Sequence, residues 1–336
     1  MDFDLSAEQR DLAAAAADFL GAGADLAAVR AALDDIETPL PVPPGRKGLV
    51  ESGFATITVP EASGGGGGTV LDLAVVAEQA GRVLAGPSLV GYARAAELLS
   101  GDQARLAALA DGSLAVAVHD GGPVLDAVGA DQFLARVGDD IVIAAGTVSP
   151  RAAIDASRGL ADVALGDAEV VLSDAAERWR RAEQVGRVVL AAEGLGAAAR
   201  AVELGVAYAK ERHAFGRPIG SYQAVKHALV DAYVEVEQLR SLVWWAAWTA
   251  EEEPAALPLA SAAAKAAAAS ALERAAETLI QVHGGIGFTW EHDAHLYWRR
   301  AKVDRLLLGD EAGALDEVAR IALGDLPGAE RAGAER

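Results

Sequence analysis

Three blocks of different periodicity follow one another along this 336-residue chain, and their order constrains the fold more than any other feature. The first block has apolar residues at helical spacing, which predicts helices at 6–20, 25–33, 71–84 and 89–99. From Gly112 the pattern changes to short β-branched or alternating runs separated by Gly and Asp. These runs predict strands at 113–119, 132–137, 140–145, 160–165 and 169–172.

The helical pattern returns at about residue 175 and continues almost to the end of the chain. It predicts helices at 180–211, 221–250, 257–282, 291–307 and 309–323. Long helices with short joints are typical of an antiparallel bundle. We therefore predict a mainly α fold with a small inserted β-domain, in which residues 1–111 form an N-terminal helical domain, 112–174 a reduced middle β-domain and 175–336 a C-terminal four-helix bundle. The Pro-rich stretch from Pro39 to Pro44 and the run from Gly64 to Gly68 interrupt the first helical block.

The charge of the chain limits its partners. Its 29 Lys and Arg residues against 49 Asp and Glu residues give a net charge of −20. A field of that sign repels phosphate backbones and anionic lipid, so nucleic-acid and membrane-surface partners are not expected. The absence of cysteine excludes disulfides and a Cys nucleophile. Since residues 1–5 are acidic and contain no apolar h-region, we expect a cytoplasmic protein.

Two segments of the C-terminal block combine polar or aromatic residues with glycine. In the first, Arg212 and Phe215 precede Gly216, and Gln223 follows seven residues later. In the second, the run Gln281-Val282-His283-Gly284-Gly285 has paired glycines that leave backbone N–H groups open to a ligand. Taken singly, each segment is also explained as an ordinary helix end.

Together the two segments resemble the flavin-binding segments of the acyl-CoA dehydrogenase family. The resemblance implies that Arg212 contacts the pyrophosphate of FAD from a neighbouring subunit, that Phe215 packs on the cofactor and that Gln223 donates a hydrogen bond to it. It also implies that residues 281–285 meet the adenylate half of FAD across a subunit interface. The chain departs from the family at Ala214, where a polar Gln or Thr is usual.

The same resemblance identifies the positions of the catalytic base, and neither holds a carboxylate. Alignment of 299–310 puts Leu308 at the usual Glu, and the alternative position falls on Gly186, before a matching Arg187 that is a weak candidate for substrate contact. Glu193, about two turns beyond Gly186, and Glu311, just past Leu308, are weak candidates for a relocated base. No metal site is predicted, because no His has the Glu three residues before it that a di-iron bundle requires.

The middle block also lacks parts of the family pattern, since no Trp occurs between residues 1 and 178. Retained dinucleotide contacts beside a missing base resemble the short subunit of heteromeric α2β2 acyl-CoA dehydrogenases of actinobacterial steroid degradation. Such a subunit shares FAD with a longer catalytic chain, desaturates an acyl-CoA and passes electrons to electron-transfer flavoprotein. Two alternatives stay open: a homo-oligomeric dehydrogenase with a relocated base, and a scaffold paralogue without flavin.

Overall fold

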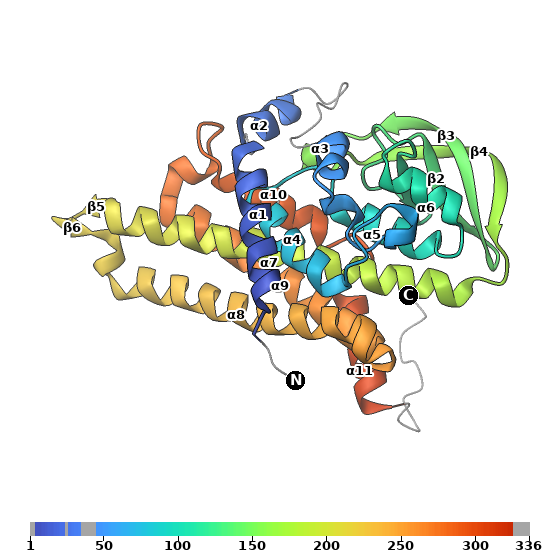
Figure 1. Cartoon of the computed structure of the whole chain (residues 1–336). Coiled ribbons are helices and arrows are strands. Elements are labelled where there is room, and N and C mark those ends of the chain that lie inside the picture. Colours follow the sequence, from blue (N-terminus) through green and yellow to red (C-terminus); the bar gives the residue numbers. More distant parts are fainter. Residues whose placement is uncertain (1–3, 24–25, 35–44, 325–336) are drawn as a thin grey trace, which may run out of the picture.

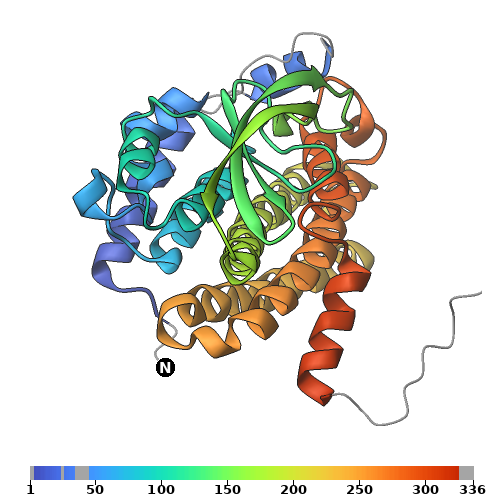
Figure 2. The same ribbon diagram turned by 90° about the vertical axis from the view of Figure 1, so that its right-hand side faces the viewer.

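The computed structural model describes residues 4–23, 26–34 and 45–324. The Pro39 to Pro44 stretch lies outside the described residues. Viewed along the longest helix, the N-terminal helices lie on one side of that helix, the last two helices on the other, and the sheet across its end (Figure 2). The chain is mainly helical with one small inserted sheet, which confirms the predicted fold class.

The N-terminal part contains six helices among the described residues: α1 (Ala7–Gly23), α2 (Leu26–Asp34), α3 (Gly45–Glu51), α4 (Val70–Arg82), α5 (Leu89–Leu98) and α6 (Gln103–Ala110). The capping box predicted at the start of α1 forms, with Gln9 N–H donating to Ser6 Oγ at 3.1 Å and Ser6 N–H donating to Gln9 Oε1 at 3.0 Å. The short helices α3 and α6 were not predicted, because they span seven and eight residues and have little periodicity.

A four-stranded sheet forms the middle of the chain, from β1 (Val116–His119), β2 (Gln132–Val137), β3 (Asp140–Pro150) and β4 (Ala161–Leu172) in that spatial order. β1 pairs in parallel with β2, and the other neighbours are antiparallel. The prediction of separate strands at 160–165 and 169–172 is wrong. Gly166 and Asp167 form an irregularity inside one continuous strand, where the register with β3 shifts, instead of a turn.

The C-terminal part consists of α7 (Ala176–Glu211), α8 (Gln223–Glu252), α9 (Leu257–His283), α10 (Ala294–Asp304) and α11 (Glu311–Leu323). A two-stranded hairpin, β5 (His213–Ala214) and β6 (Arg217–Pro218), joins α7 to α8 and projects at the end of the bundle opposite the sheet (Figure 1). By length and mean hydropathy, 1.3, the segment Pro254–Phe288 could cross a membrane, but 61% of its most apolar window is buried inside the protein. That burial is typical of a core helix.

Glycines allow α4 and α7 to pack unusually closely. A Cβ on Gly81 would lie 1.9 Å from the carbonyl oxygen of Glu193, and a Cβ on Gly196 would lie 1.8 Å from that of Glu78. Any larger side chain would therefore push the two helices apart. This contact holds the N-terminal helices against the centre of α7, which runs from the sheet at one end to the hairpin at the other.

Candidate functional site

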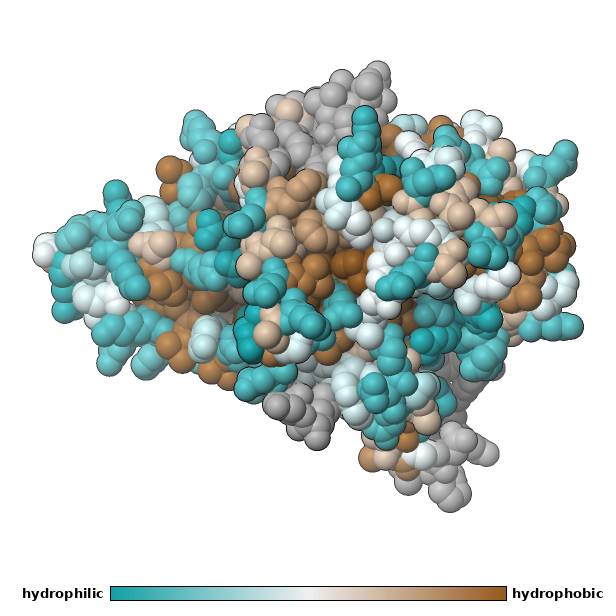
Figure 3. All heavy atoms as spheres, viewed as in Figure 1, coloured by the Kyte–Doolittle hydropathy of each residue, from teal (hydrophilic) through white to brown (hydrophobic). Residues whose placement is uncertain are grey.

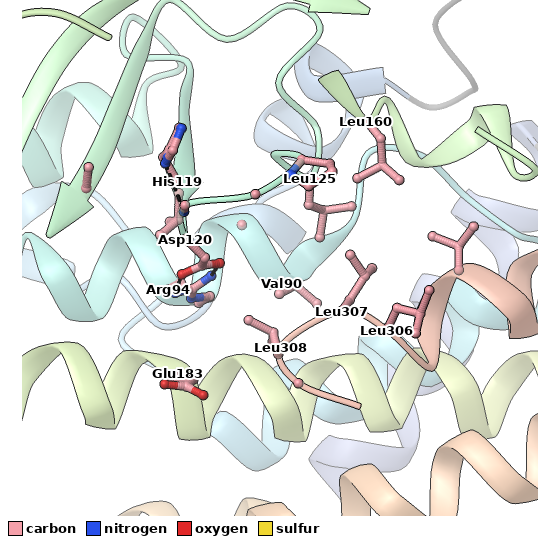
Figure 4. A pocket seen from close by; sticks show the side chains of 18 of the residues that line it. Val90, Arg94, His119, Asp120, Leu125, Leu160, Glu183, Leu306, Leu307 and Leu308 are labelled. Atoms are coloured by element: carbon pink, nitrogen blue, oxygen red, sulfur yellow. Dashed lines mark hydrogen bonds and ion pairs between the residues drawn. The ribbon is translucent and has the colours of Figure 1, made fainter. Parts of the chain in front are cut away.

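A cavity of about 1020 Å³ opens between the sheet, α5, the first part of α7 and the turn that follows α10. Figure 4 shows Val90 of α5, Leu125 and Leu160 from the loops of the β-domain, and Leu306 to Leu308 from the turn, all around this space. The polar side chains of its lining include Arg94, Asp120 and Glu183. An apolar space with a few polar groups is the usual form of a small-molecule site.

The two positions at which the sequence comparison placed a missing base lie against one another in this cavity wall. A Cβ on Gly186 would lie 3.0 Å from Leu308 Cδ1 and 2.7 Å from Arg94 Cδ. Arg94 therefore fills the space that a side chain at position 186 would need. Leu308 has a positive φ of 56° and is followed by Gly309 at 94°, so a strained turn holds the leucine at the cavity.

Arg94 is fixed by a two-point ion pair with Asp120. Its Nη1 and Nη2 lie 2.6 Å from the two carboxylate oxygens of Asp120, and its guanidinium carbon lies 5.5 Å from the ring centroid of Trp179. Only 3% of the Arg94 side chain is exposed. A bidentate pair of this kind has both strength and fixed geometry, so Arg94 holds both carboxylate oxygens of Asp120 in place.

Arg187, the weak candidate for substrate contact, lies behind the cavity wall instead of lining it. Its Nε donates to the carbonyl oxygen of Leu308 at 3.1 Å, and its two Nη atoms pair with Glu317 at 2.6 Å and Glu183 at 2.8 Å. Arg187 thus positions the turn that carries Leu308. Glu183 itself lines the cavity, one helical turn before Gly186 on the same face of α7.

Glu193, a candidate for a relocated base, lies in a buried ionic network away from the cavity lining. Its Oε1 accepts hydrogen bonds from Ser88 Oγ at 2.8 Å and Leu89 N–H at 2.9 Å, and its Oε2 lies 2.6 Å from Arg158 Nη1. Burial alone would lower the pKa of Arg158, but the carboxylates of Asp304 and Glu193 outweigh it and hold that pKa well above its usual value. Glu193 therefore caps α5 and neutralises Arg158, which leaves it unsuited to remove a proton from a ligand.

Glu311, the other candidate, also lies outside the cavity lining, and its Oε2 pairs with Arg305 Nη2 at 3.0 Å. The network around Arg158 continues through Asp304 to Arg300, which pairs with Asp155 at 2.6 Å. These charges join α7, α10 and the segment before β4.

The opposite end of α7 carries the predicted flavin contacts. Phe215, at the tip of the hairpin, is 96% exposed and has a positive φ of 51°. Together with Tyr222 it lines one groove, of about 650 Å³, whose other wall includes Gln281 and Val282 of α9. Phe215 of the first segment and Gln281 and Val282 of the second therefore line the same groove. Apolar side chains continue over this part of the bundle (Figure 3).

The remaining predicted contacts lie outside the lining of that groove. Arg212 ends α7 and is exposed, with its carbonyl accepting from Ile219 N–H at 2.7 Å, and Gln223 is the exposed first residue of α8. His283 is buried, stacked on Tyr208 at 4.0 Å between centroids, and burial lowers its pKa. Gly284 and Gly285 are exposed, and no atom lies within 4 Å of where a Cβ would be on either one. No side chain covers the backbone there, and the N–H of Gly284 donates to the carbonyls of Ile280 and Gln281 at the end of α9.

The sequence analysis missed Arg94, Asp120 and Glu183. The available signal was an arginine inside a predicted apolar helix, since Arg94 lies among Val90, Ala93 and Leu98. A charged residue on such a face needs a partner, but the sequence does not show which one.

Comparison with known proteins identifies the family. Residues 6–100 match "Acyl-CoA dehydrogenase, N-terminal domain" and residues 180–323 match "Acyl-CoA dehydrogenase, C-terminal domain". The chain is 36% identical over 261 residues to acyl-CoA dehydrogenase IpdE2 of Mycolicibacterium smegmatis, covering 76% of this chain and 80% of that protein. Its structure is similar to a chain of the ChsE4-ChsE5 complex from Mycobacterium tuberculosis, with a TM-score of 0.83 and 26% identity over 97% of this chain and 100% of the other. A second similar structure is the Tcur3481-Tcur3483 steroid ACAD G363A variant, with a TM-score of 0.80 and 26% identity over 94% and 98%. The chain therefore belongs to the acyl-CoA dehydrogenase family of oxidoreductases.

Proposed function

We propose that this chain is a subunit of an FAD-dependent acyl-CoA dehydrogenase and that it completes a flavin site shared with a longer partner chain, which supplies the catalytic carboxylate. One observation carries the proposal: Leu308 and Gly186 occupy both base positions, and Arg94 fills the space that a side chain at position 186 would need. A base must reach the proton on the α carbon of the thioester.

The residues at the hairpin end fit a dinucleotide. They offer an exposed aromatic ring at Phe215, an exposed cation at Arg212, and the open backbone of Gly284 and Gly285. An arginine is suited to phosphate oxygens, an aromatic ring is suited to a flat ring system, and backbone without side chains allows a ligand to approach closely. When bound, FAD accepts the hydride that leaves the β carbon of the acyl group.

The kind of assembly is proposed from the similar structures. The structure with a TM-score of 0.83 comes from a complex of two different chains, and the Tcur3481-Tcur3483 structure is described as a steroid ACAD. We therefore propose an α2β2 assembly that acts on a steroid-derived acyl-CoA in the cytoplasm, with electron-transfer flavoprotein as the electron acceptor.

The test is co-expression of this chain with a longer acyl-CoA dehydrogenase chain that retains the Glu. We expect a co-purifying complex with a flavin absorption spectrum, and loss of desaturation when that Glu of the partner is changed to Gln. A complex that carries no flavin would contradict the proposal and support the scaffold alternative instead.

An autonomous homo-oligomer is a second candidate because Glu183 lines the cavity beside Asp120, while Glu193 and Glu311 do not. In this alternative Glu183 would act as the base, with its Oε1 held by Arg187. The purified homomer should then desaturate acyl-CoA, and Glu183→Gln should abolish the reaction. The matched control is Glu317→Gln, which removes the other carboxylate paired with Arg187.

A further inference from the structure

Cations without a partner are concentrated at the hairpin end of the chain. Most Lys and Arg side chains of the described ranges have a hydrogen bond or an ion pair within the chain. Those that have neither with any described residue are Lys210, Arg212, Arg217, Lys226 and Arg320. All of these except Arg320 lie at the end of α7, in the hairpin or in the first turns of α8, and all four are exposed.

The charge of this segment is opposite in sign to that of the rest of the chain. Residues 210–227 contain four cations and one carboxylate, Glu211, so they carry +3, and the other residues carry −23 of the net −20. No acidic residue occurs in the first turn of α8, and no side chain caps it. The positive end of the helix dipole therefore adds to the same field. An anionic surface is repelled by most of this chain and attracted to its hairpin end.

These cations surround an apolar centre. The guanidinium carbon of Arg217 lies 4.1 Å from the centroid of the Tyr222 ring, whose hydroxyl donates to the carbonyl of Ala214 at 3.1 Å. Tyr222 lines the same groove as the exposed ring of Phe215. Lys226 follows Tyr222 by one turn on the same side of α8. Figure 3 shows hydrophilic side chains gathered at this tip of the molecule, with apolar ones behind them.

An apolar centre with a charged rim is the usual form of a protein–protein interface. A nucleic acid or an anionic membrane fits this end less well, because an extended polyanion would also meet the −23 carried by the rest of the chain. A compact acidic patch on a protein can touch the hairpin end alone. Arg212 has its own role toward the flavin in the proposed function, which leaves Lys210, Arg217 and Lys226 for a protein partner.

We propose that Lys210, Arg217 and Lys226 form a docking surface for an acidic patch on the longer partner chain, and that they steer the two chains together. The identity of the partner rests on the proposed function, whereas the sign and the place of the surface rest on this chain alone. Charges at the rim of an interface act mainly on the association rate, and the contacts at its centre act mainly on dissociation.

The test measures association of the purified full-length chain with the longer chain of the co-expression experiment, by stopped-flow fluorescence with FAD present in excess. The double variant Arg217→Glu/Lys226→Glu reverses two of the three cations. Lys226→Glu alone is the second variant, and it should not harm folding, because a carboxylate is favourable near the start of a helix. The matched control is Arg320→Glu, which reverses the remaining unpaired cation near the end of α11.

For the unchanged chain we expect the association rate constant to fall by about tenfold between about 20 and 300 mM NaCl. The double variant should associate about tenfold more slowly at the lower salt concentration, with a much weaker dependence on salt. Its dissociation rate constant should stay within about twofold. Arg320→Glu should behave as the unchanged chain. Equal salt dependence in all variants, an equal loss in Arg320→Glu, or a loss confined to the dissociation rate would each overturn the proposed surface.

The same measurements separate this inference from the proposed function. A flavin-containing complex that forms equally fast with and without the charge reversals would leave the proposed function standing and overturn the docking surface. Failure of the unchanged chain to associate with the longer chain would overturn both. Binding of a short DNA duplex as tightly as the longer chain would identify a polyanionic backbone as the partner and would overturn the assignment to an acidic protein.

Discussion

The two ends of α7 differ in how their polar side chains are satisfied. At the sheet end, Arg94, Arg187 and Arg158 each pair with carboxylates of the same chain. At the hairpin end, Arg212, Gln223 and Gln281 are exposed, and their side chains have no hydrogen bond or ion pair within the described ranges. One end is complete within a single chain, while the other presents groups that only another molecule could engage.

This difference between the two ends of α7 supports the proposed use of the hairpin end as an interface. A cavity whose carboxylates are already paired is suited to holding a ligand, whereas an exposed set of cation, amide, aromatic ring and bare backbone is suited to an interface. Phe215 makes the contrast clearest, because a phenylalanine at positive φ and 96% exposure is unfavourable for an isolated chain. The predictions below test this contrast, beginning with the largest expected effect.

Removing Glu193 should cause the largest loss of stability. Glu193→Ala leaves Arg158 with one carboxylate fewer and removes the acceptor for Ser88 Oγ and Leu89 N–H in a buried site. We expect the free energy of unfolding to fall by about 3–5 kcal/mol in urea titrations. The control Glu203→Ala removes a half-exposed partner of Arg82 and should cost no more than about 1 kcal/mol. Equal effects of the two substitutions would show that the buried network does not hold the sheet end together.

The sheet end should also show a characteristic pH dependence through Asp126. Burial raises the pKa of Asp126 to about 7, although the charges of Arg46 and Arg158 oppose the shift. Between about pH 4 and 7 the folded chain therefore keeps a proton that the unfolded chain has lost, so stability falls as pH rises through this window and levels off above it.

The isosteric variant Asp126→Asn cannot titrate, and its amide oxygen can still accept from Ser88 N–H. The difference in unfolding free energy between variant and wild type should therefore change by about 3 kcal/mol from pH 4.5 to 7.5, in favour of the variant at high pH. Parallel stability curves over this range would rule out a buried proton at Asp126.

The features that depend on residues close together in the sequence could be predicted, and the contacts between residues far apart in the sequence could not. Periodicity predicted most helices and the position of the sheet, because each depends on residues within one or two turns. The glycines of the second segment mark the end of α9, where the N–H of Gly284 donates to the carbonyls of Ile280 and Gln281 and no side chain covers positions 284 and 285. The pairing of Arg158 with Asp304 joins residues 146 positions apart, and no local pattern encodes such a contact.

The two base positions also show that the sequence gives the position of a residue but not its contacts. Alignment placed Leu308 and Gly186 in the missing positions, but only the three-dimensional structure shows that a side chain at position 186 would collide with both Leu308 and Arg94. Likewise Glu193 lies on the same helix as Gly186, which made it a reasonable candidate from spacing alone. Its actual partner, Arg158, comes from the segment before β4.

A carboxylate at position 308 should disturb the cavity wall moderately. Leu308→Glu places a charge against the space beside Gly186 and the alkyl part of Arg94, in a residue already at positive φ. We expect a loss of about 1 kcal/mol in unfolding free energy, and Leu306→Glu, at 67% exposure, should change it by less than about 0.5 kcal/mol. If both variants unfolded identically, the packing of Leu308 would not distinguish the two positions.

The smallest effect on the isolated chain should come from Phe215, which is where the contrast between the two ends is sharpest. Phe215→Ala removes a ring that is almost fully exposed and leaves no cavity in the core. The unfolding free energy should therefore change by less than about 0.5 kcal/mol. In the complex with the longer chain, however, the same ring would pack against the flavin or the partner, and its loss should weaken flavin retention by about tenfold. The matched control is Val137→Ala, another exposed apolar residue, 59% exposed, at the sheet end. Flavin release, measured by absorbance during dialysis, should separate the two variants. If both complexes kept flavin equally, the hairpin would not be part of the shared site, and its exposed phenylalanine would need another partner.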